Sequence, residues 1–144
     1  VFVVVANHCA SSAGETGISV ERYHIPAIIY APGFIAPGRI DKVCSQIDLM
    51  PTLFSMLDFS YDSRFYGRNI LDPDYRERAF MATYQDLGYY ADGVLTVLSP
   101  VERIRQFRVT ENPDGTHTET EMETPALPLV REAQVFYQSV NLGY

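Results

Sequence analysis

The sequence predicts an α/β fold, with part of a doubly wound sheet followed by a small antiparallel sheet and a C-terminal helix. Three observations predict it. Residues 1–5 (Val-Phe-Val-Val-Val) are apolar without alternation, which is typical of a strand covered on both faces in a parallel sheet. Apolar side chains then recur at helical spacing between residues 47 and 57. Beyond residue 76, short β-rich segments separated by turn residues indicate an antiparallel meander.

The first half continues with a second buried strand and one helix. Residues 27–31 (Ala-Ile-Ile-Tyr-Ala) form the strand, bracketed by Pro26 and by Pro32-Gly33. Ser45 and Asp48 have the spacing of a capping box, so the helix begins there. We interpret Asp48 as a structural cap rather than a catalytic carboxylate. The apolar stripe of the helix comprises Ile47, Leu49, Met50, Leu53, Phe54 and Leu57.

The second half is predicted to be a meander closed by a helix. Its strands are expected at residues 78–84, 94–98 and 104–110. After a strong turn signal at 112–115, segment 116–123 alternates like an exposed edge strand with a charged face, so His117 is expected to be solvated. Pro125 and Pro128 interrupt the chain. The closing helix presents an apolar face made of Leu129, Ala133, Phe136, Tyr137 and Val140.

Length and composition suit a globular domain. The chain has 144 residues, and we divide it into an α/β part, 1–75, and an antiparallel subdomain with the terminal helix, 76–144. Because a buried central strand begins at residue 1 with no preceding turn, we expect the chain to be a piece of a larger protein.

Charge and cysteine content exclude some classes of function. The net charge of −7 argues against a nucleic-acid backbone as partner, because phosphate contacts need clustered Lys and Arg. No apolar run of about 18 residues occurs, so we expect no membrane-spanning helix within the sequence. The two cysteines, Cys9 and Cys44, fit neither a zinc site nor a disulfide framework, and a bridge between them stays open.

The candidate site follows the first strand. Ligand sites of open α/β sheets lie beyond the carboxyl ends of such strands, where Asn7 and His8 stand. Both side chains can ligate a metal or hold an oxyanion. His24 lies close to Pro26 and either holds a phosphate or sulfate oxygen or is structural. The small residues 11–14 (Ser-Ser-Ala-Gly) either cradle an anion or form a plain loop.

Four segments, in this order, resemble a known family. They are Val3-Val4-Val5-Ala6-Asn7-His8, residues 23–33 with Ile25-Pro26 and Pro32-Gly33, residues 46–53 with Asp48-Leu49-Met50-Pro51-Thr52-Leu53, and Thr83-Tyr84-Gln85-Asp86-Leu87-Gly88-Tyr89. Together they resemble the C-terminal part of a sulfatase-like domain of the alkaline phosphatase superfamily. Within it, the chain looks closest to the lipoteichoic acid synthase, or phosphoglycerol transferase, branch. The resemblance implies the C-terminal portion of an alkaline-phosphatase-like αβα sandwich.

This resemblance implies a fragment of a metal-dependent sulfuric or phosphoric ester hydrolase or phosphoglycerol-type transferase. Family members end the first of these strands in Asp-His, two ligands of a divalent ion such as Mn, Mg, Ca or Zn. Asn7 and His8 occupy those positions here, and an uncharged amide oxygen should bind a hard cation less tightly than a carboxylate. The family's nucleophile lies upstream, so no catalytic nucleophile is expected in this chain and the isolated chain should be inactive. His24 is the expected substrate-binding residue.

Two other functions stay open. One is a catalytically silent sulfatase-like domain that binds a glycan or a phospholipid head group, which Asn7 in the Asp position favours. The other is a structural interaction module. The resemblance implies a membrane-anchored parent outside the cytoplasm, in the periplasm or on the outer face of the inner membrane. Expected partners are a sulfate- or phosphate-ester substrate, the upstream half of the same domain, and a second copy pairing at the sheet edge.

Overall fold

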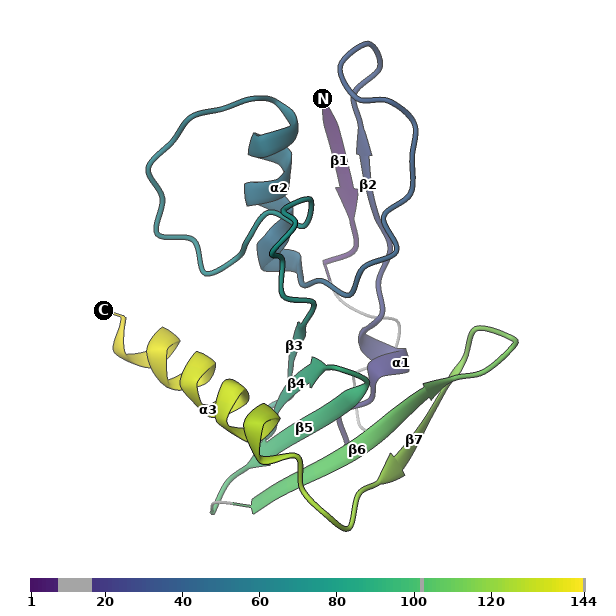
Figure 1. Ribbon diagram of the computed structural model, residues 1–144, viewed down its shortest axis with the longest axis vertical. Helices are drawn as coiled ribbons and strands as arrows, with labels where there is room; N and C mark the ends of the chain where they lie inside the picture. Colours follow the sequence, from purple (N-terminus) through teal and green to yellow (C-terminus); the bar gives the residue numbers. More distant parts are fainter. Residues whose placement is uncertain (8–16, 102, 144) are drawn as a thin grey trace. The chain divides into compact units, whose positions relative to one another are not determined.

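The computed structural model describes residues 1–7, 17–101 and 103–143 (Figure 1). They form two compact units, and each is described by itself. The first unit comprises Val1–Asn7 and Ile25–Arg78, and the second comprises residues 17–24 and 79–143. The elements in chain order are β1 (Phe2–Val5), α1 (Val20–Tyr23), β2 (Ala27–Tyr30), the short 3-10 helix η1 (Gln46–Asp48), α2 (Leu49–Met56), β3 (Ala79–Ala82), β4 (Leu87–Ala91), β5 (Val94–Ser99), β6 (Arg103–Glu111), β7 (His117–Glu121) and α3 (Leu127–Leu142).

The mixed α/β fold class is confirmed, but the surroundings of the first strands differ from the prediction. β1 pairs with β2 antiparallel, with Phe2 opposite Tyr30 and Val5 opposite Ala27. Phe2 is 68% exposed, so the expectation of a parallel strand buried on both faces is wrong for the described chain. Burial of β2 was also expected, and it too is mostly exposed. A run of apolar residues favours a strand with two apolar faces, but burial of those faces requires other segments that pack on them.

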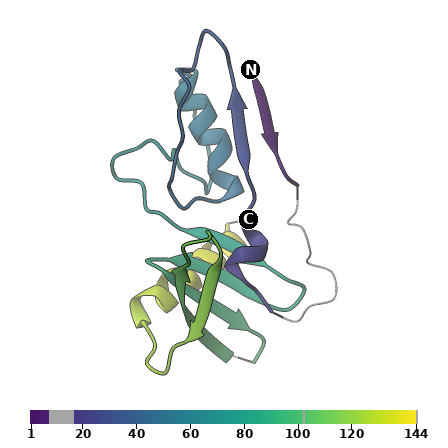
Figure 2. The same ribbon diagram turned by 90° about the vertical axis from the view of Figure 1, so that its right-hand side faces the viewer.

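The helix of the first unit begins as predicted and turns a different face inward. Ser45 and Asp48 form the capping box at the start of η1, which leads into α2 beside the paired strands β1 and β2 (Figure 2). Met50 is 43% exposed although the apolar stripe predicted its burial, whereas polar Thr52 is buried. Thr52 Oγ1 donates to the Asp48 carbonyl at 2.7 Å and accepts from Ile70 N–H at 3.0 Å. These bonds turn the Thr52 face toward segment 67–70.

Gly67 lets segment 67–70 lie directly against η1. A Cβ atom at this position would stand 1.8 Å from the Ile47 carbonyl oxygen and 2.9 Å from the Asp48 nitrogen. Both neighbours are backbone atoms, so no side-chain movement can relieve the contact. Glycine is therefore required here for close packing.

The second unit is a five-stranded antiparallel meander in the order β3-β4-β5-β6-β7. The predicted strand 78–84 ends at Ala82, and β4 is an additional strand that the sequence analysis did not identify. The turn between them depends on Thr83, whose Oγ1 accepts from Asp86 N–H at 2.9 Å, while Thr83 N–H donates to the Asp86 carbonyl at 2.9 Å. This turn contains neither Gly nor Pro, so the usual turn signal was missing.

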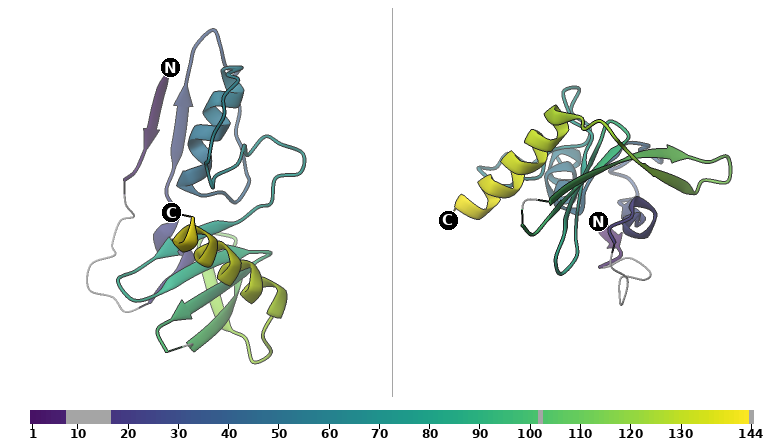
Figure 3. Two further views of the ribbon diagram at one scale, coloured as in Figure 1. Left: turned by 90° about the vertical axis from the view of Figure 1, so that its left-hand side faces the viewer. Right: turned by 90° about the horizontal axis from the view of Figure 1, so that it is seen from below.

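Both faces of the meander are covered. One face, with Leu95 and Val97, packs against Ile18 and Val20 from the segment at α1. The opposite face packs against α3, which lies across the strands in Figure 3. The predicted apolar face of α3 is confirmed, since Leu129 and Ala133 are buried and Phe136, Tyr137 and Val140 are half-buried.

A buried glutamine holds the start of α3. Gln106 Oε1 accepts from Ala126 N–H at 2.6 Å, and its Nε2 donates to Thr96 Oγ1 at 2.8 Å. Pro128 lies in the first turn of α3, so the expected interruption there is wrong. Proline is tolerated in a first turn because the N–H it lacks has no partner inside the helix. None of the helices in the described part of the chain is long and apolar enough to cross a membrane.

We predict that Gly67→Ala destabilises the protein by at least about 1–3 kcal/mol, because the new methyl group cannot fit against the Ile47 backbone. Gly38→Ala is the matched control, since a Cβ atom at Gly38 meets nothing within 4 Å. Urea unfolding curves of the two variants test this. Equal urea midpoints for the two variants would show that a methyl group at position 67 is accommodated and that glycine is not required there.

Candidate functional site

Asn7 is the described part of the predicted metal site. It follows β1 with an exposed side chain, and the preceding carbonyl of Ala6 accepts a hydrogen bond from Gln46 Nε2 at 2.7 Å. This bond ties the end of β1 to η1. His8, Cys9 and the small-residue segment 11–14 lie outside the described residues, so the expectations that rest on them stay predictions.

The described residues do not make up a metal site by themselves. No group of three or more His, Cys, Asp or Glu side chains that could hold a metal ion occurs within residues 1–7, 17–101 and 103–143. Asn7 offers one uncharged oxygen, which alone is too weak a donor set for a divalent ion. A metal site that included Asn7 would need further ligands from residues that lie outside the described set.

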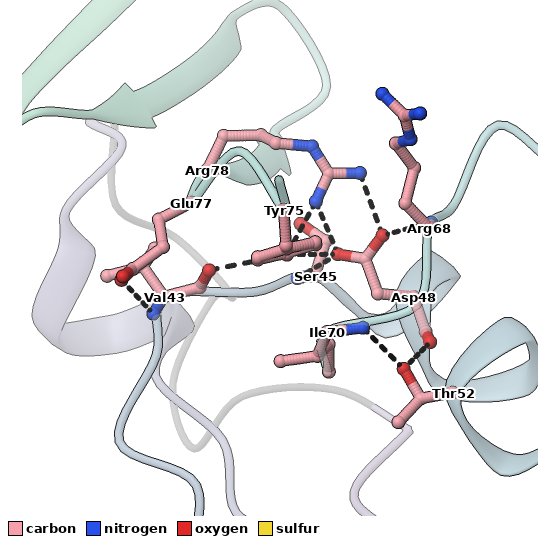
Figure 4. A network of polar contacts seen from close by, with 9 residues as sticks. All are labelled: Val43, Ser45, Asp48, Thr52, Arg68, Ile70, Tyr75, Glu77 and Arg78. Carbon is pink, nitrogen blue, oxygen red and sulfur yellow. Dashed lines mark hydrogen bonds and ion pairs between the residues drawn. The ribbon is translucent and has the colours of Figure 1, made fainter. Parts of the chain in front are cut away.

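Asp48 is the centre of the densest polar network in the first unit (Figure 4). Its carboxylate has no exposed surface. Oδ1 accepts from Arg78 Nη2 at 2.7 Å and from Arg68 N–H at 2.8 Å. Oδ2 accepts from Arg78 Nη1 at 2.6 Å, from the Tyr75 hydroxyl at 2.8 Å and from Ser45 N–H at 2.9 Å. The carboxylate is therefore held by donors from three separate stretches of chain.

The electrostatics of this network keep Asp48 ionised. Burial is the largest single influence and by itself would raise its pKa, but the hydrogen bonds from Arg78, Arg68, Ser45 and Tyr75 together lower the pKa below its usual value. Burial and the neighbouring carboxylate raise the pKa of Tyr75. Because both carboxylate oxygens already accept hydrogen bonds from these residues, Asp48 has no lone pair left for a substrate. Its interpretation as a structural cap is confirmed, and its partners Arg78 and Tyr75 are additional residues that no local pattern indicated.

His24 stands in a second cluster, within the other unit. It is exposed directly after α1, and its ring lies edge-to-face to that of His117 with the centroids 6.2 Å apart. His117 Nδ1 lies 2.7 Å from Glu21 Oε2, and the His117 side chain is only 14% exposed. The expectation that His117 is solvated is therefore wrong, because α1 packs against the edge strand β7. Glu119 also contributes, accepting from Val20 N–H at 2.7 Å.

The two clusters differ in what they can do chemically. The Asp48 network is closed and serves the fold. The exposed His24 imidazole can donate a hydrogen bond to an anionic oxygen, so its substrate role stays a prediction. Asn7 belongs to the first unit and His24 to the second, and each is described only in its own surroundings.

We predict that Asp48→Asn destabilises the protein by about 3–5 kcal/mol, because it leaves the buried Arg78 guanidinium without its counter-charge. The matched control is Asp41→Asn, which removes the same charge from the exposed ion pair with Arg39 and should cost at most about 1 kcal/mol. Chemical denaturation measures both. A similar loss in the two variants would contradict a special role for the buried pair.

Acid stability offers a milder test of the same network. Since the pKa of Asp48 is lowered from 3.8 in the folded protein, its contribution is present above that value and is lost as the pH falls through the folded pKa. Tyr75→Phe removes one donor, so acid unfolding should begin at a higher pH than in the wild type. Tyr61→Phe, at a 42% exposed tyrosine, is the control. Circular dichroism during acid titration should show a shifted midpoint for Tyr75→Phe alone.

Comparison with known proteins places this fold. No protein-family model matches the sequence. Among solved structures, the chain is similar to the crystal structure of a protein in the alkaline phosphatase superfamily from Vibrio parahaemolyticus, with a TM-score of 0.79 and 28% sequence identity. The match covers 99% of this chain and 35% of that one. The chain thus shares the fold of a part of that protein that makes up 35% of its length. This likeness supports a relationship of the chain to the alkaline phosphatase superfamily.

Proposed function

We propose that this chain is part of a metal-dependent enzyme that hydrolyses or transfers phosphate or sulfate esters. The observation that carries the proposal is the likeness to an alkaline phosphatase superfamily protein over 99% of the chain. Asn7 is compatible with it, because the residue follows β1 with an exposed side chain whose amide oxygen can bind a hard cation. The nucleophile and the remaining ligands would lie outside this chain.

The finer assignment is the lipoteichoic acid synthase branch, which transfers phosphoglycerol. Its support is the order of the sequence segments, above all Thr83–Tyr89 following the Asp48–Leu53 pattern. That branch implies a lipid- or glycan-linked ester substrate, a membrane-anchored parent and a site outside the cytoplasm. These three features rest on the sequence resemblance alone.

Within this proposal, the residues of the chain have separate tasks. Asn7 offers its amide oxygen and His8 a ring nitrogen to a divalent ion, which when bound lowers the pKa of a nucleophile and stabilises developing negative charge. His24 donates a hydrogen bond to a non-bridging oxygen of the ester. The donor is an exposed imidazole, whose ring lies edge-to-face to the ring of His117.

A second candidate function is a catalytically silent domain of the same fold that binds an anionic glycan or a phospholipid head group. The observation that favours it is Asn7, which replaces the charged ligand expected at this position with a neutral one. Weak cation affinity together with head-group binding would distinguish this function from catalysis.

We predict that Asn7→Asp, in the complete gene product, tightens Mn²⁺ binding by roughly tenfold, because it adds a negative charge next to His8. Asn141→Asp adds the same charge at the exposed end of α3 and should leave the affinity unchanged. Isothermal titration calorimetry measures both. An unchanged affinity in Asn7→Asp would remove Asn7 from the ligands.

Turnover separates the two candidate functions. The complete gene product should hydrolyse 4-nitrophenyl phosphate or 4-nitrophenyl sulfate in the presence of Mn²⁺, and His8→Ala should abolish this activity without changing the circular dichroism spectrum. Normal turnover in His8→Ala would overturn the assignment of His8. No turnover of either compound by the wild type, combined with binding of glycerol phosphate, would favour the silent domain.

A further inference from the structure

Helix α1 is held in place by contacts with the meander. Val20 lies in the core of the second unit, and its backbone N–H donates to Glu119 Oε1 on β7 at 2.7 Å. The Tyr23 hydroxyl donates to the carbonyl of Ala82, the last residue of β3, at 2.7 Å. A helix of four residues is too short to be stable by itself in water. The position of α1 therefore depends on its contacts with the sheet.

The contact between Glu21 and His117 has a defined direction. Glu21 Oε2 lies 2.7 Å from His117 Nδ1. An ionised carboxylate can only accept hydrogen bonds, so Nδ1 must carry the proton that it donates to Glu21. The His117 side chain is 14% exposed and the Glu21 side chain 49%. The imidazole is therefore mostly covered, and its orientation is set by the carboxylate.

His117 contacts two residues on the same side of α1. Glu21 and His24 are three positions apart, so their side chains lie next to each other along the helix. The exposed His24 ring lies edge-to-face to the His117 ring, with the centroids 6.2 Å apart and the planes at 79°. Glu21 thus holds the ring against which the His24 ring lies.

We propose that Glu21 and His117 are positioning residues for His24. Their hydrogen bond holds the His117 ring and the end of α1, and it thereby keeps the His24 imidazole in the orientation in which it donates to an oxygen of a phosphate or sulfate ester. His117 does not itself bind the ester, since its ring is mostly covered and its Nδ1–H is directed at Glu21. This proposal rests on the proposed function through the role of His24 alone.

A double-mutant cycle in the complete gene product tests the proposal, with the kinetics of the 4-nitrophenyl ester as the readout. A hydrogen bond made equally in the ground and transition states affects KM and leaves kcat unchanged, so His24→Ala should raise KM by roughly tenfold or more. Glu21→Ala should raise KM at least about threefold by itself, and not at all in the His24→Ala background, because it acts only through His24.

Two further variants separate the hydrogen bond from the charge of Glu21. Glu21→Gln keeps an acceptor oxygen for His117 Nδ1, so it should have a KM close to that of the wild type. Glu123→Ala removes the same charge from an exposed glutamate beyond β7 and should leave KM unchanged.

Nuclear magnetic resonance tests the same contact without turnover. Two-bond ¹H–¹⁵N spectra show which ring nitrogen carries the proton, and the signals are assigned by their loss in His24→Ala and His117→Phe. Neutral His117 should have its proton on Nδ1, because the carboxylate of Glu21 accepts from that nitrogen. Glu21→Ala should remove this preference and shift the ring signals of His24.

The results that would overturn the proposal differ from those that would overturn the proposed function. An equal rise in KM from Glu21→Ala with and without His24 would assign the pair a purely structural role. Neutral His117 with its proton on Nε2, or His24 signals that do not shift in Glu21→Ala, would also overturn the positioning. Shifted His24 signals together with an unchanged KM in His24→Ala would confirm the positioning and overturn the ester-binding role of His24.

Discussion

The buried ion pair between Asp48 and Arg78 is the constraint on which the first unit depends. It joins the start of the helix formed by η1 and α2 to the residue directly before β3, thirty positions further along. A third stretch is added through Arg68 N–H. A buried pair of this kind fixes geometry more than it adds net stability, because the desolvation of both charges offsets much of their attraction. Through Arg68 and Arg78, the segment that follows α2 is tied at two points to the start of that helix.

The close approach at Gly67 and the burial of Thr52 both follow from this constraint. With Arg68 N–H directed at the carboxylate, the backbone just before it must touch the Ile47 carbonyl, and any Cβ atom would prevent the contact. The same approach brings Ile70 N–H to Thr52 Oγ1. The hydroxyl of Thr52, on the buried side of α2, thereby has hydrogen-bond partners, whereas the apolar side chain of Met50 is exposed.

Local features of the sequence could be predicted and distant pairings could not. The capping box is a relation between residues three apart, and the apolar face of α3 is a periodic pattern, so both were readable from the sequence. Arg78 contacts Asp48 at a separation of 30 positions, and His117 contacts Glu21 at a separation of 96. No sequence pattern links the members of either pair. The strand at residues 2–5 was predictable from its composition, but its exposure depends on which other segments are present. For the candidate metal site, Asn7 is placed and His8 remains a prediction.

The route of the chain through the two units has a consequence for how the protein can be made. The connection between β1 and β2 leaves the first unit, supplies Ile18 and Val20 to the core of the second, and returns. The sequence segments of the two units therefore alternate along the chain. Cutting the polypeptide after Arg78 would not yield the two units as separate fragments. When β1 and β2 have left the ribosome, Ile18 and Val20 have left it as well. The β3–β7 sheet that these two residues pack against has not yet been synthesised. Val20 is synthesised 75 residues before Leu95 (95 − 20), one of the strand residues it packs against, and apolar surface exposed at that stage favours aggregation.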